Sequence, residues 1–412
     1  MAARWHDATA SATLGSVPPT VPADPIVAPL PIPATALAIG PIPLAIPVVL
    51  APMAGITNPT FRRLCRRHGA GLYVSEMITA RGLVEGASAT WARAAFDPDE
   101  SPRSIQLYGS DPVSMGQAVR LLVADGHVDH IDLNLGCPVR KITRHGGGAA
   151  LTARPRLLAA VLGAAVGAAD AEAGPGRVPV TVKFRTGIDD DTLTYLTTGQ
   201  VAEDAGCAAV ALHARTAAQL YSGTADWDAI GRLKQAVTSI PVLGNGDIWT
   251  ATDALRMMQH SGCDGVVVGR GCLGRPWLFR DLADAFAGRT PQPAPALGAV
   301  VDTLAEHLAL LVEWMGERRA LMDIRKHVGW YLAGYPVGGA VRRALMDASS
   351  LDAFTDTLGS LDRTVALPAE SVGGRRGTQR GPQKVTLPYR WLEDRDSAEP
   401  PARSADALTS GG

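Results

Sequence analysis

Short apolar runs recur along the middle of the chain and predict buried β-strands. Ala- and Leu-rich stretches separate them, each long enough to form a helix. Continuous apolar runs, without strict alternation of apolar and polar residues, are typical of strands that are covered on both faces. Eight strand–helix units predict an α/β fold, a (β/α)8 TIM barrel, with a doubly wound parallel sheet as the alternative. The runs are Pro47–Gly55, Leu72–Ile78, Arg103–Gly109, His130–Pro138, Val178–Gly187, Ala208–Arg215, Ile240–Ile248 and Gly265–Gly271.

Unusual polar and glycine residues come at the carboxyl end of nearly every run. In a TIM barrel these ends meet at one rim, where the loops after the strands build the active site. This clustering favours the barrel over the doubly wound sheet.

The segments outside the barrel have different compositions. We expect the barrel over residues 37–288, a Pro-rich linker over 289–298, and a small C-terminal α-helical domain over 299–367. Residues 1–36 are rich in Pro and Ala and predict a disordered leader. Residues 368–412 predict a disordered tail, within which Val385–Asp394 is apolar enough to dock on the folded part.

Composition limits the classes of function. The chain has 39 Lys+Arg and 40 Asp+Glu, so no bulk positive charge indicates a nucleic-acid partner. Its five cysteines show no metal-ligand spacing, which predicts neither a disulfide framework nor a metal site. The uncharged stretch from Ile26 to Phe61 is interrupted by prolines, which do not permit a membrane-spanning helix. We expect a cytoplasmic protein.

Glycine-rich segments at the ends of the last two strands predict a phosphate site. Asn245, Gly246 and Asp247 follow the seventh strand, and Gly269 and Arg270 follow the eighth. Glycine lets backbone N–H groups approach phosphate oxygens, and an arginine adds charge-assisted hydrogen bonds. Either segment alone could be an ordinary turn. Both together, in the two loops that commonly bind phosphate in barrels, favour a phosphate-bearing ligand.

Other polar residues on the strands suggest what that ligand is. Lys183 lies in an apolar run, where it could stabilise a reduced flavin or extend to solvent. Gln106 could bind the edge of a flavin ring or be a core amide. Cys137, between a glycine and a proline, could be a general acid or a buried thiol. His213 and Arg215, two residues apart on one strand, point to one face and could hold a polar ring, although His213 could also be a core histidine.

The motifs and their order resemble the tRNA-dihydrouridine synthase family, most closely its bacterial B-type branch. The resemblance runs from about Leu37 to Leu367. It is carried by APMAG (Ala51–Gly55), SEM (Ser75–Met77), QLYG, NLGCPVRKITRHGGGAAL (Asn134–Leu151), VKFRTG, HARTAAQLYSG (His213–Gly223), GNGDI, VVVGRG, and Arg325-Lys326-His327 followed by Trp330-Tyr331.

The resemblance implies an FMN-dependent oxidoreductase that uses NADPH to reduce the C5–C6 double bond of specific uridines in tRNA. Cys137 would be the proton donor. The residues implied for the flavin are Pro52, Met53, Ala54, Gln106, Lys183 and His213, with Asn245, Gly246, Asp247, Gly269 and Arg270 for ribityl and phosphate. The residues expected to meet tRNA are Asn134, Arg215, Arg325, Lys326 and His327, with Tyr221 as an aromatic neighbour of the extruded base.

Two other functions stay open at this point. One is an FMN barrel that acts on a free pyrimidine, as dihydroorotate dehydrogenase does, and the other is a non-catalytic RNA-binding relative. We expect a monomer that holds tRNA with a few local clusters of positive charge. These are Arg62, Arg63, Arg66 and Arg67, then Arg318, Arg319, Arg325 and Lys326, and then Arg342 and Arg343.

Overall fold

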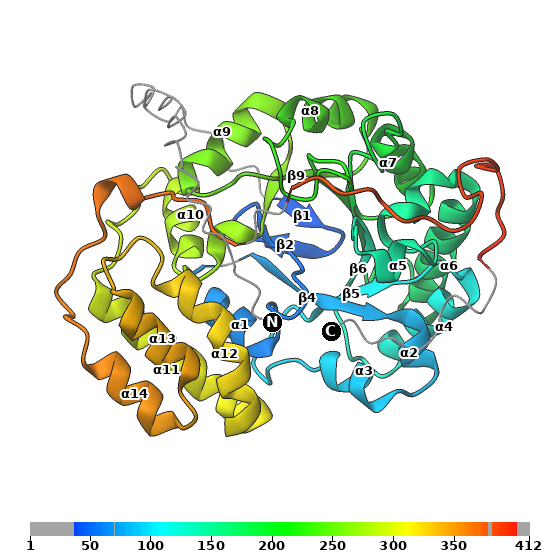
Figure 1. Cartoon of the computed structure of the whole chain (residues 1–412). Coiled ribbons are helices and arrows are strands. Elements are labelled where there is room, and N and C mark those ends of the chain that lie inside the picture. The colour runs from blue at the N-terminus through cyan, green and yellow to red at the C-terminus, as the bar shows by residue number, and fades with distance from the viewer. Residues whose placement is uncertain (1–36, 70, 378–380, 402–412) are drawn as a thin grey trace, which may run out of the picture. The chain divides into compact units, whose positions relative to one another are not determined.

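A closed barrel of eight parallel strands forms the centre of the fold (Figure 1). The computed structural model describes residues 37–69, 71–377 and 381–401. The predicted (β/α)8 barrel is confirmed, and closure of the sheet between its first and last strands excludes the doubly wound alternative. In order, the strands are β3 (Val48–Leu50), β4 (Leu72–Thr79), β5 (Ser104–Tyr108), β6 (His130–Leu135), β7 (Val180–Arg185), β8 (Ala209–His213), β9 (Val242–Asn245) and β10 (Gly265–Val268).

Helices between and after the strands cover the outside of the barrel. Side-chain caps fix where several of them begin: Asn58 accepts a hydrogen bond from the Phe61 N–H (3.0 Å), and Thr250 and Asp253 form a capping box. The helices are α1 (Pro59–Arg66), α2 (Ala80–Val84), α3 (Ser88–Arg93), α4 (Pro112–Ala124), α5 (Arg140–Thr143), α6 (Pro155–Ala173), α7 (Tyr195–Asp204), α8 (Trp227–Ala236), α9 (Ala251–Ser261) and α10 (Leu278–Phe286), with short 3-10 helices η1 (Gly148–Ala153) and η2 (Arg270–Cys272).

A two-stranded antiparallel hairpin precedes the barrel. Its strands are β1 (Leu37–Ile39) and β2 (Ile42–Leu44), which the apolar pattern did not predict. Leu37, Ile39 and Leu44 are buried in one cluster with inward-facing residues of the barrel strands. The hairpin therefore fills the end of the barrel opposite the carboxyl ends of the strands. The predicted leader, residues 1–36, lies outside the described residues.

The C-terminal helices have their own apolar core. They are α11 (Leu297–Met315), α12 (Glu317–Tyr331), α13 (Gly339–Asp347) and α14 (Leu351–Gly359). Aromatic contacts join them to the barrel, because the ring of Phe61 on α1 lies 5.8 Å from the rings of both His307 and His327. None of the helices in the described ranges is both long and apolar enough to cross a membrane.

Residues 368–377 and 381–401 pack against the folded part of the chain. After the 3-10 helix η3 (Ala369–Ser371), the segment reaches Trp391, which is only 3% exposed and donates a hydrogen bond to the Ala150 carbonyl (2.8 Å). This differs from the disordered tail that composition predicts, although Val385–Asp394 docks as its apolar character suggested. Residues 402–412 lie outside the described residues.

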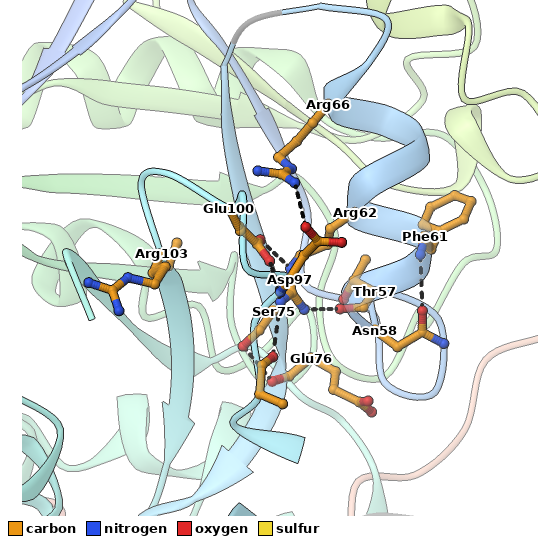
Figure 2. Close-up of polar contacts among 12 residues, drawn as sticks. Thr57, Asn58, Phe61, Arg62, Arg66, Ser75, Glu76, Asp97, Glu100 and Arg103 are labelled. Carbon is orange, nitrogen blue, oxygen red and sulfur yellow. Dashed lines mark hydrogen bonds and ion pairs between the residues drawn. The ribbon is translucent and has the colours of Figure 1, made fainter. Parts of the chain in front are cut away.

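Arg62 belongs to a buried ion pair and not to a surface cluster of cations (Figure 2). Its Nε and Nη2 donate to the two carboxylate oxygens of Glu100 (2.6 and 2.8 Å), and its Nη1 donates to the Thr57 carbonyl (2.7 Å). Arg66, on the same helix, pairs with Asp97. Both arginines tie α1 to the segment before β5, so the expectation that Arg62 helps to hold RNA is corrected: the side chain is fully buried.

We predict that Arg62→Met lowers the free energy of unfolding by about 3–5 kcal/mol, because it leaves the Glu100 carboxylate buried without its partner. Arg120→Met is the control, since Arg120 pairs with Glu172 at the surface and such pairs contribute about 0–1 kcal/mol. Urea unfolding of both variants measures the difference. Equal losses would show that the Arg62–Glu100 pair does not stabilise the fold.

Candidate functional site

A cavity of about 480 Å³ opens at the carboxyl ends of the barrel strands. Loops after most of the strands contribute to its wall, as expected for a TIM-barrel active site. The structure brings most of the sequence-predicted residues together in this wall. They are Pro52, Met53, Ala54, Gln106, Asn134, Cys137, Lys183, His213, Tyr221, Asn245, Gly246, Asp247, Gly269 and Arg270.

Arg270 lies at one end of the cavity between two aromatic rings. Its Cζ is 4.2 Å from the ring centre of Tyr221 and 5.0 Å from that of Trp249. Cation–π contacts of this kind hold a guanidinium in place without using up its hydrogen-bond donors. Asp247 lies 3.6 Å from Arg270 Nη2. Trp249 was not among the predicted site residues, although it follows directly on the GNGDI motif.

Arg215 lies behind the same end of the cavity and does not line it. Its Nη2 donates to both carboxylate oxygens of Asp247 (2.9 and 2.7 Å), and its side chain is 1% exposed. Its Nη1 is buried without a hydrogen-bond partner among the residues that the structure describes. Gly246 lies next to it with φ +129°, and a Cβ there would come within 2.7 Å of Ala225. The positive charge of Arg215 behind the wall, together with the charge of Arg270, therefore suits an anion at this end of the cavity.

Lys183 faces the cavity from β7 and donates a hydrogen bond to Asn245 Oδ1 (2.8 Å). Burial, with the charge of Arg185 next to it, lowers the pKa of Lys183 to about 7, although Asp132 opposes the shift. The amine is therefore poised to change its charge near neutral pH. An anion in the cavity favours its protonated form.

A chain of hydrogen bonds on β5 and β6 leads to Cys137. Gln106 Nε2 donates to Asp132 Oδ2 (2.7 Å), and Asn134 Nδ2 donates to Gln106 Oε1 (2.8 Å). Asn134 Oδ1 then accepts from the backbone N–H groups of Gly136 (3.1 Å) and Cys137 (2.9 Å). Asp132 is buried, and desolvation raises its pKa to about 6 in spite of its hydrogen bonds from Thr181 and Gln106. Each amide orientation is thereby fixed by its neighbour.

The Cys137 thiol is half-buried in the cavity wall. Burial raises its pKa, while the Val139 backbone N–H and the charge of Arg185 lower it by less. The sulfur is therefore held as a neutral thiol, the form that can give up a proton. Gly148, with φ +55°, permits the loop to close, because a Cβ there would lie 2.5 Å from the Cys137 carbonyl oxygen.

Arg185 is a residue of the site that the sequence reasoning missed. Its Nε donates to the Gly136 carbonyl (3.0 Å), and its Nη1 donates to the carbonyls of Thr216 and Leu220 (both 2.9 Å). It thus ties the Cys137 loop to the loop after β8. The sequence could have indicated this role, because Arg185 follows Lys183 by two residues in VKFRTG and therefore lies on the same face of the strand.

His213 lines the cavity as a neutral ring. Burial and the charges of Arg185, Lys183, Arg215 and Arg270 hold its pKa well below the ordinary range. It therefore adds no charge to the cavity at neutral pH.

The three predicted residues on α12 are separated by the fold. His327 is fully buried between Phe61 and His307, so it belongs to the packing of the helices and not to an exposed RNA-binding surface. Arg325 Nη2 donates to the Ala348 carbonyl (3.4 Å). Lys326 pairs with Asp323, and its Nζ lies 3.9 Å from where a Cβ on Gly55 would be.

Trp330, one helical turn after Lys326, is a second residue of α12 at the mouth of the barrel. It lines the cavity, and the sequence reasoning gave it no role in the site. The helix therefore supplies part of the rim. Among residues 37–69, 71–377 and 381–401, no group of three or more His, Cys, Asp or Glu side chains is arranged to hold a metal ion.

Comparison with known proteins gives consistent matches. A family model described as "Dihydrouridine synthase (Dus)" matches residues 49–365. A probable tRNA-dihydrouridine synthase of Mycobacterium tuberculosis is 53% identical over 92% of this chain and 98% of its own length. One from Mycobacterium leprae is 50% identical over 88% of this chain and all of its own length. The tRNA-dihydrouridine synthase B of Pseudomonas aeruginosa is 42% identical over 72% of this chain and 87% of its own.

We predict that Lys183 makes the free energy of unfolding rise with pH. The unfolded chain keeps a proton on this lysine up to the ordinary pKa of 10.5, whereas the folded chain begins to lose it near 7. Between pH 7 and 9, protein freed of bound small molecules should therefore gain up to about 2 kcal/mol of stability relative to Lys183→Met. Urea unfolding at both pH values measures it, with Lys234→Met as the control for losing a lysine at the barrel surface. Parallel pH profiles for the wild type and Lys183→Met would contradict the shifted pKa.

Proposed function

The chain belongs to the dihydrouridine synthase family, and on that premise we propose that it uses FMN and NADPH to reduce the C5–C6 double bond of specific uridines in tRNA. The observation that carries the proposal is a single cavity with a neutral thiol, Cys137, in its wall and an anion-binding end formed by Arg270 and its neighbours. A phosphate-bearing flavin and a pyrimidine ring that must be protonated require these two features together.

The residues at the anion-binding end fit the phosphate and ribityl chain of FMN. The guanidinium groups of Arg215 and Arg270 supply positive charge at this end, and Gly246 and Gly269, which both line the cavity, carry no side chain to keep a phosphate from their backbone. Pro52, Met53 and Ala54 supply an apolar wall for the ring. When bound here, FMN would supply the hydride chemistry that reduction of the uracil needs and that no side chain of the protein can provide.

Lys183 and Gln106 are the polar side chains that would face the flavin ring in the cavity. When protonated, the amine offers a cation beside Asn245 that stabilises negative charge on a ring in the cavity. Gln106 is held rigidly by Asp132 and Asn134, so its amide presents a fixed edge to the ring. These residues act by binding and orienting and do not themselves exchange protons with the substrate.

Cys137 is the proposed proton donor. Negative charge develops on C5 and the C4 carbonyl of the uracil during reduction, and the thiol gives its proton to C5. The raised pKa keeps the thiol protonated before the reaction. Asn134 and Arg185 hold the loop that carries it, through the Cys137 N–H and the Gly136 carbonyl respectively. They are positioning residues for the proton transfer.

A uridine of folded RNA must leave its stack to reach this cavity. Trp330 and Tyr221 lie in the wall, where an extruded base can stack, and Lys326 lies on the same helix as Trp330. The small number of cations at the mouth favours recognition of RNA by shape and a few phosphate contacts over general attraction by charge.

We predict that Cys137→Ala keeps bound FMN and its reduction by NADPH but slows the oxidation of reduced enzyme by tRNA by about 10²–10⁴-fold, the usual contribution of a positioned general acid. Cys207→Ala, at a buried cysteine that does not line the cavity, is the matched control. Single-turnover absorbance measurements separate the two half-reactions. An unchanged rate with tRNA would remove Cys137 from this role.

We also predict that Lys326→Ala weakens tRNA binding by about three- to ten-fold and makes it less sensitive to salt, as expected for the loss of one phosphate contact. Flavin reduction by NADPH should not change. Arg363→Ala is the control, because Arg363 pairs with Asp302 outside the cavity wall. Titration of labelled tRNA at two salt concentrations gives both quantities. Equal affinities and salt dependences for Lys326→Ala and Arg363→Ala would show that Lys326 does not contact the RNA.

A further inference from the structure

The segment after the helical domain is attached to α12 at its start. Arg376 is buried, and its guanidinium donates to the carbonyls of Trp330 and Ala333 (the second at 3.3 Å). The Trp330 carbonyl lies in the last turn of α12, and the Ala333 carbonyl lies two residues beyond the end of the helix. The segment is thus fixed next to Trp330, which lines the cavity.

Two glycines then bring the main chain onto the loops at the anion-binding end of the cavity. A Cβ on Gly377 would lie 3.3 Å from the aliphatic carbons of Arg270 and 3.0 Å from Leu273, and one on Gly373 would lie 3.0 Å from Thr250. Both glycines have positive φ, +78° and +73°. The backbone of the segment therefore covers the stem of Arg270, and Gly377 itself lines the cavity.

Further along, the segment joins the loop that follows β8. The Gln383 backbone N–H donates to the Ala218 carbonyl (2.9 Å), and Gln383 lines the cavity. Ala218 lies in the same loop as Tyr221, whose ring contacts Arg270. Val385 and Leu387 pack against the barrel core.

Trp391 is the second anchor. Its Nε1 donates to the Ala150 carbonyl (2.8 Å), and the Arg154 guanidinium lies 3.8 Å from its ring centre. Gly146 leaves room for the ring, since a Cβ there would lie 2.7 Å from the Trp391 side chain. Arg395 adds a hydrogen bond to the Ala153 carbonyl (3.2 Å). In Figure 1 this red part of the chain runs across the barrel towards the side on which α5 and α6 lie.

We propose that residues 373–377 and 381–395 form a C-terminal clamp that covers the phosphate end of the cavity, fixes Arg270 and slows the release of FMN. The inference rests on the proposed function, because it takes FMN as the ligand. The Arg270 guanidinium lies between the rings of Tyr221 and Trp249, and its aliphatic carbons lie against Gly377. The side chain therefore cannot change its rotamer while the clamp is in place. The clamp is held at both ends, so opening this end of the cavity breaks the contacts of Arg376 or of Trp391.

The test is the rate at which the FMN-loaded full-length protein releases its flavin, measured as the recovery of free-flavin fluorescence after dilution. Trp391→Ala and Gly377→Ala should release FMN at least about ten-fold faster, the ratio that corresponds to losing one favourable contact. Trp391→Phe keeps an aromatic ring beside Arg154 but loses the hydrogen bond to the Ala150 carbonyl, so its release rate should lie between those of the wild type and Trp391→Ala.

Two glycine variants serve as controls. Gly126→Ala introduces an alanine at positive φ (+59°) where nothing lies within 4 Å, so it tests strain alone. Gly381→Ala lies in the same segment as Gly377 and also meets nothing within 4 Å. Both should release FMN at the wild-type rate. Unfolding midpoints of the flavin-free variants are measured in parallel, because a purely structural role would lower them in step with FMN retention.

Release at the wild-type rate from both Trp391→Ala and Gly377→Ala would overturn the clamp while leaving the proposed function intact. If Trp391→Ala does not fold, the FMN release rate of Gly377→Ala, compared with that of Gly126→Ala, decides whether the clamp slows release. A wild-type protein that retains no FMN would overturn the proposed function and the clamp together.

Discussion

A chain of hydrogen bonds inside the barrel connects the buried carboxylate of Asp132 to the backbone N–H of Cys137. A buried carboxylate is costly unless donors surround it, and here the Gln106 amide and the Thr181 hydroxyl are those donors. Because the Gln106 NH₂ group donates to Asp132, the Gln106 carbonyl is left to accept from the Asn134 NH₂ group. The Asn134 carbonyl then faces the loop that carries Cys137. The need to satisfy one buried charge thereby fixes the backbone of the loop that carries the Cys137 thiol.

The charges of the cavity are unbalanced in a way that suits an anionic ligand. Four cationic side chains lie close enough to His213 for each of their charges to lower its pKa. They are Lys183, Arg185, Arg215 and Arg270. Asp247 is engaged by Arg215, and Asp132 lies beneath Gln106. Because positive charges held close together repel one another in a partly desolvated site, a bound phosphate or reduced ring relieves this repulsion. This local excess of positive charge favours anions in the cavity, although the chain as a whole is not basic.

The barrel and most of its site could be predicted because each depends on local patterns. Buried parallel strands have continuous apolar runs, and their carboxyl ends are marked by residues such as Asn245 and Cys137. The β1–β2 hairpin gave no such pattern, since each of its strands is only three residues long. Arg62 looked like a surface cation because its partner, Glu100, is distant in sequence. The packing of Trp391 could not be predicted either, since one aromatic residue in a polar segment does not reveal that its contacts lie at Gly146, Ala150 and Arg154.

The most direct test of the proposed function is to incubate the purified protein with FMN, NADPH and unmodified tRNA and to analyse the RNA by mass spectrometry after nuclease digestion. We expect defined uridines to gain the mass of two hydrogens, whereas free uracil and uridine under the same conditions should not. An enzyme that oxidises NADPH and reduces a free pyrimidine, or that leaves every uridine of the tRNA unchanged, would contradict it.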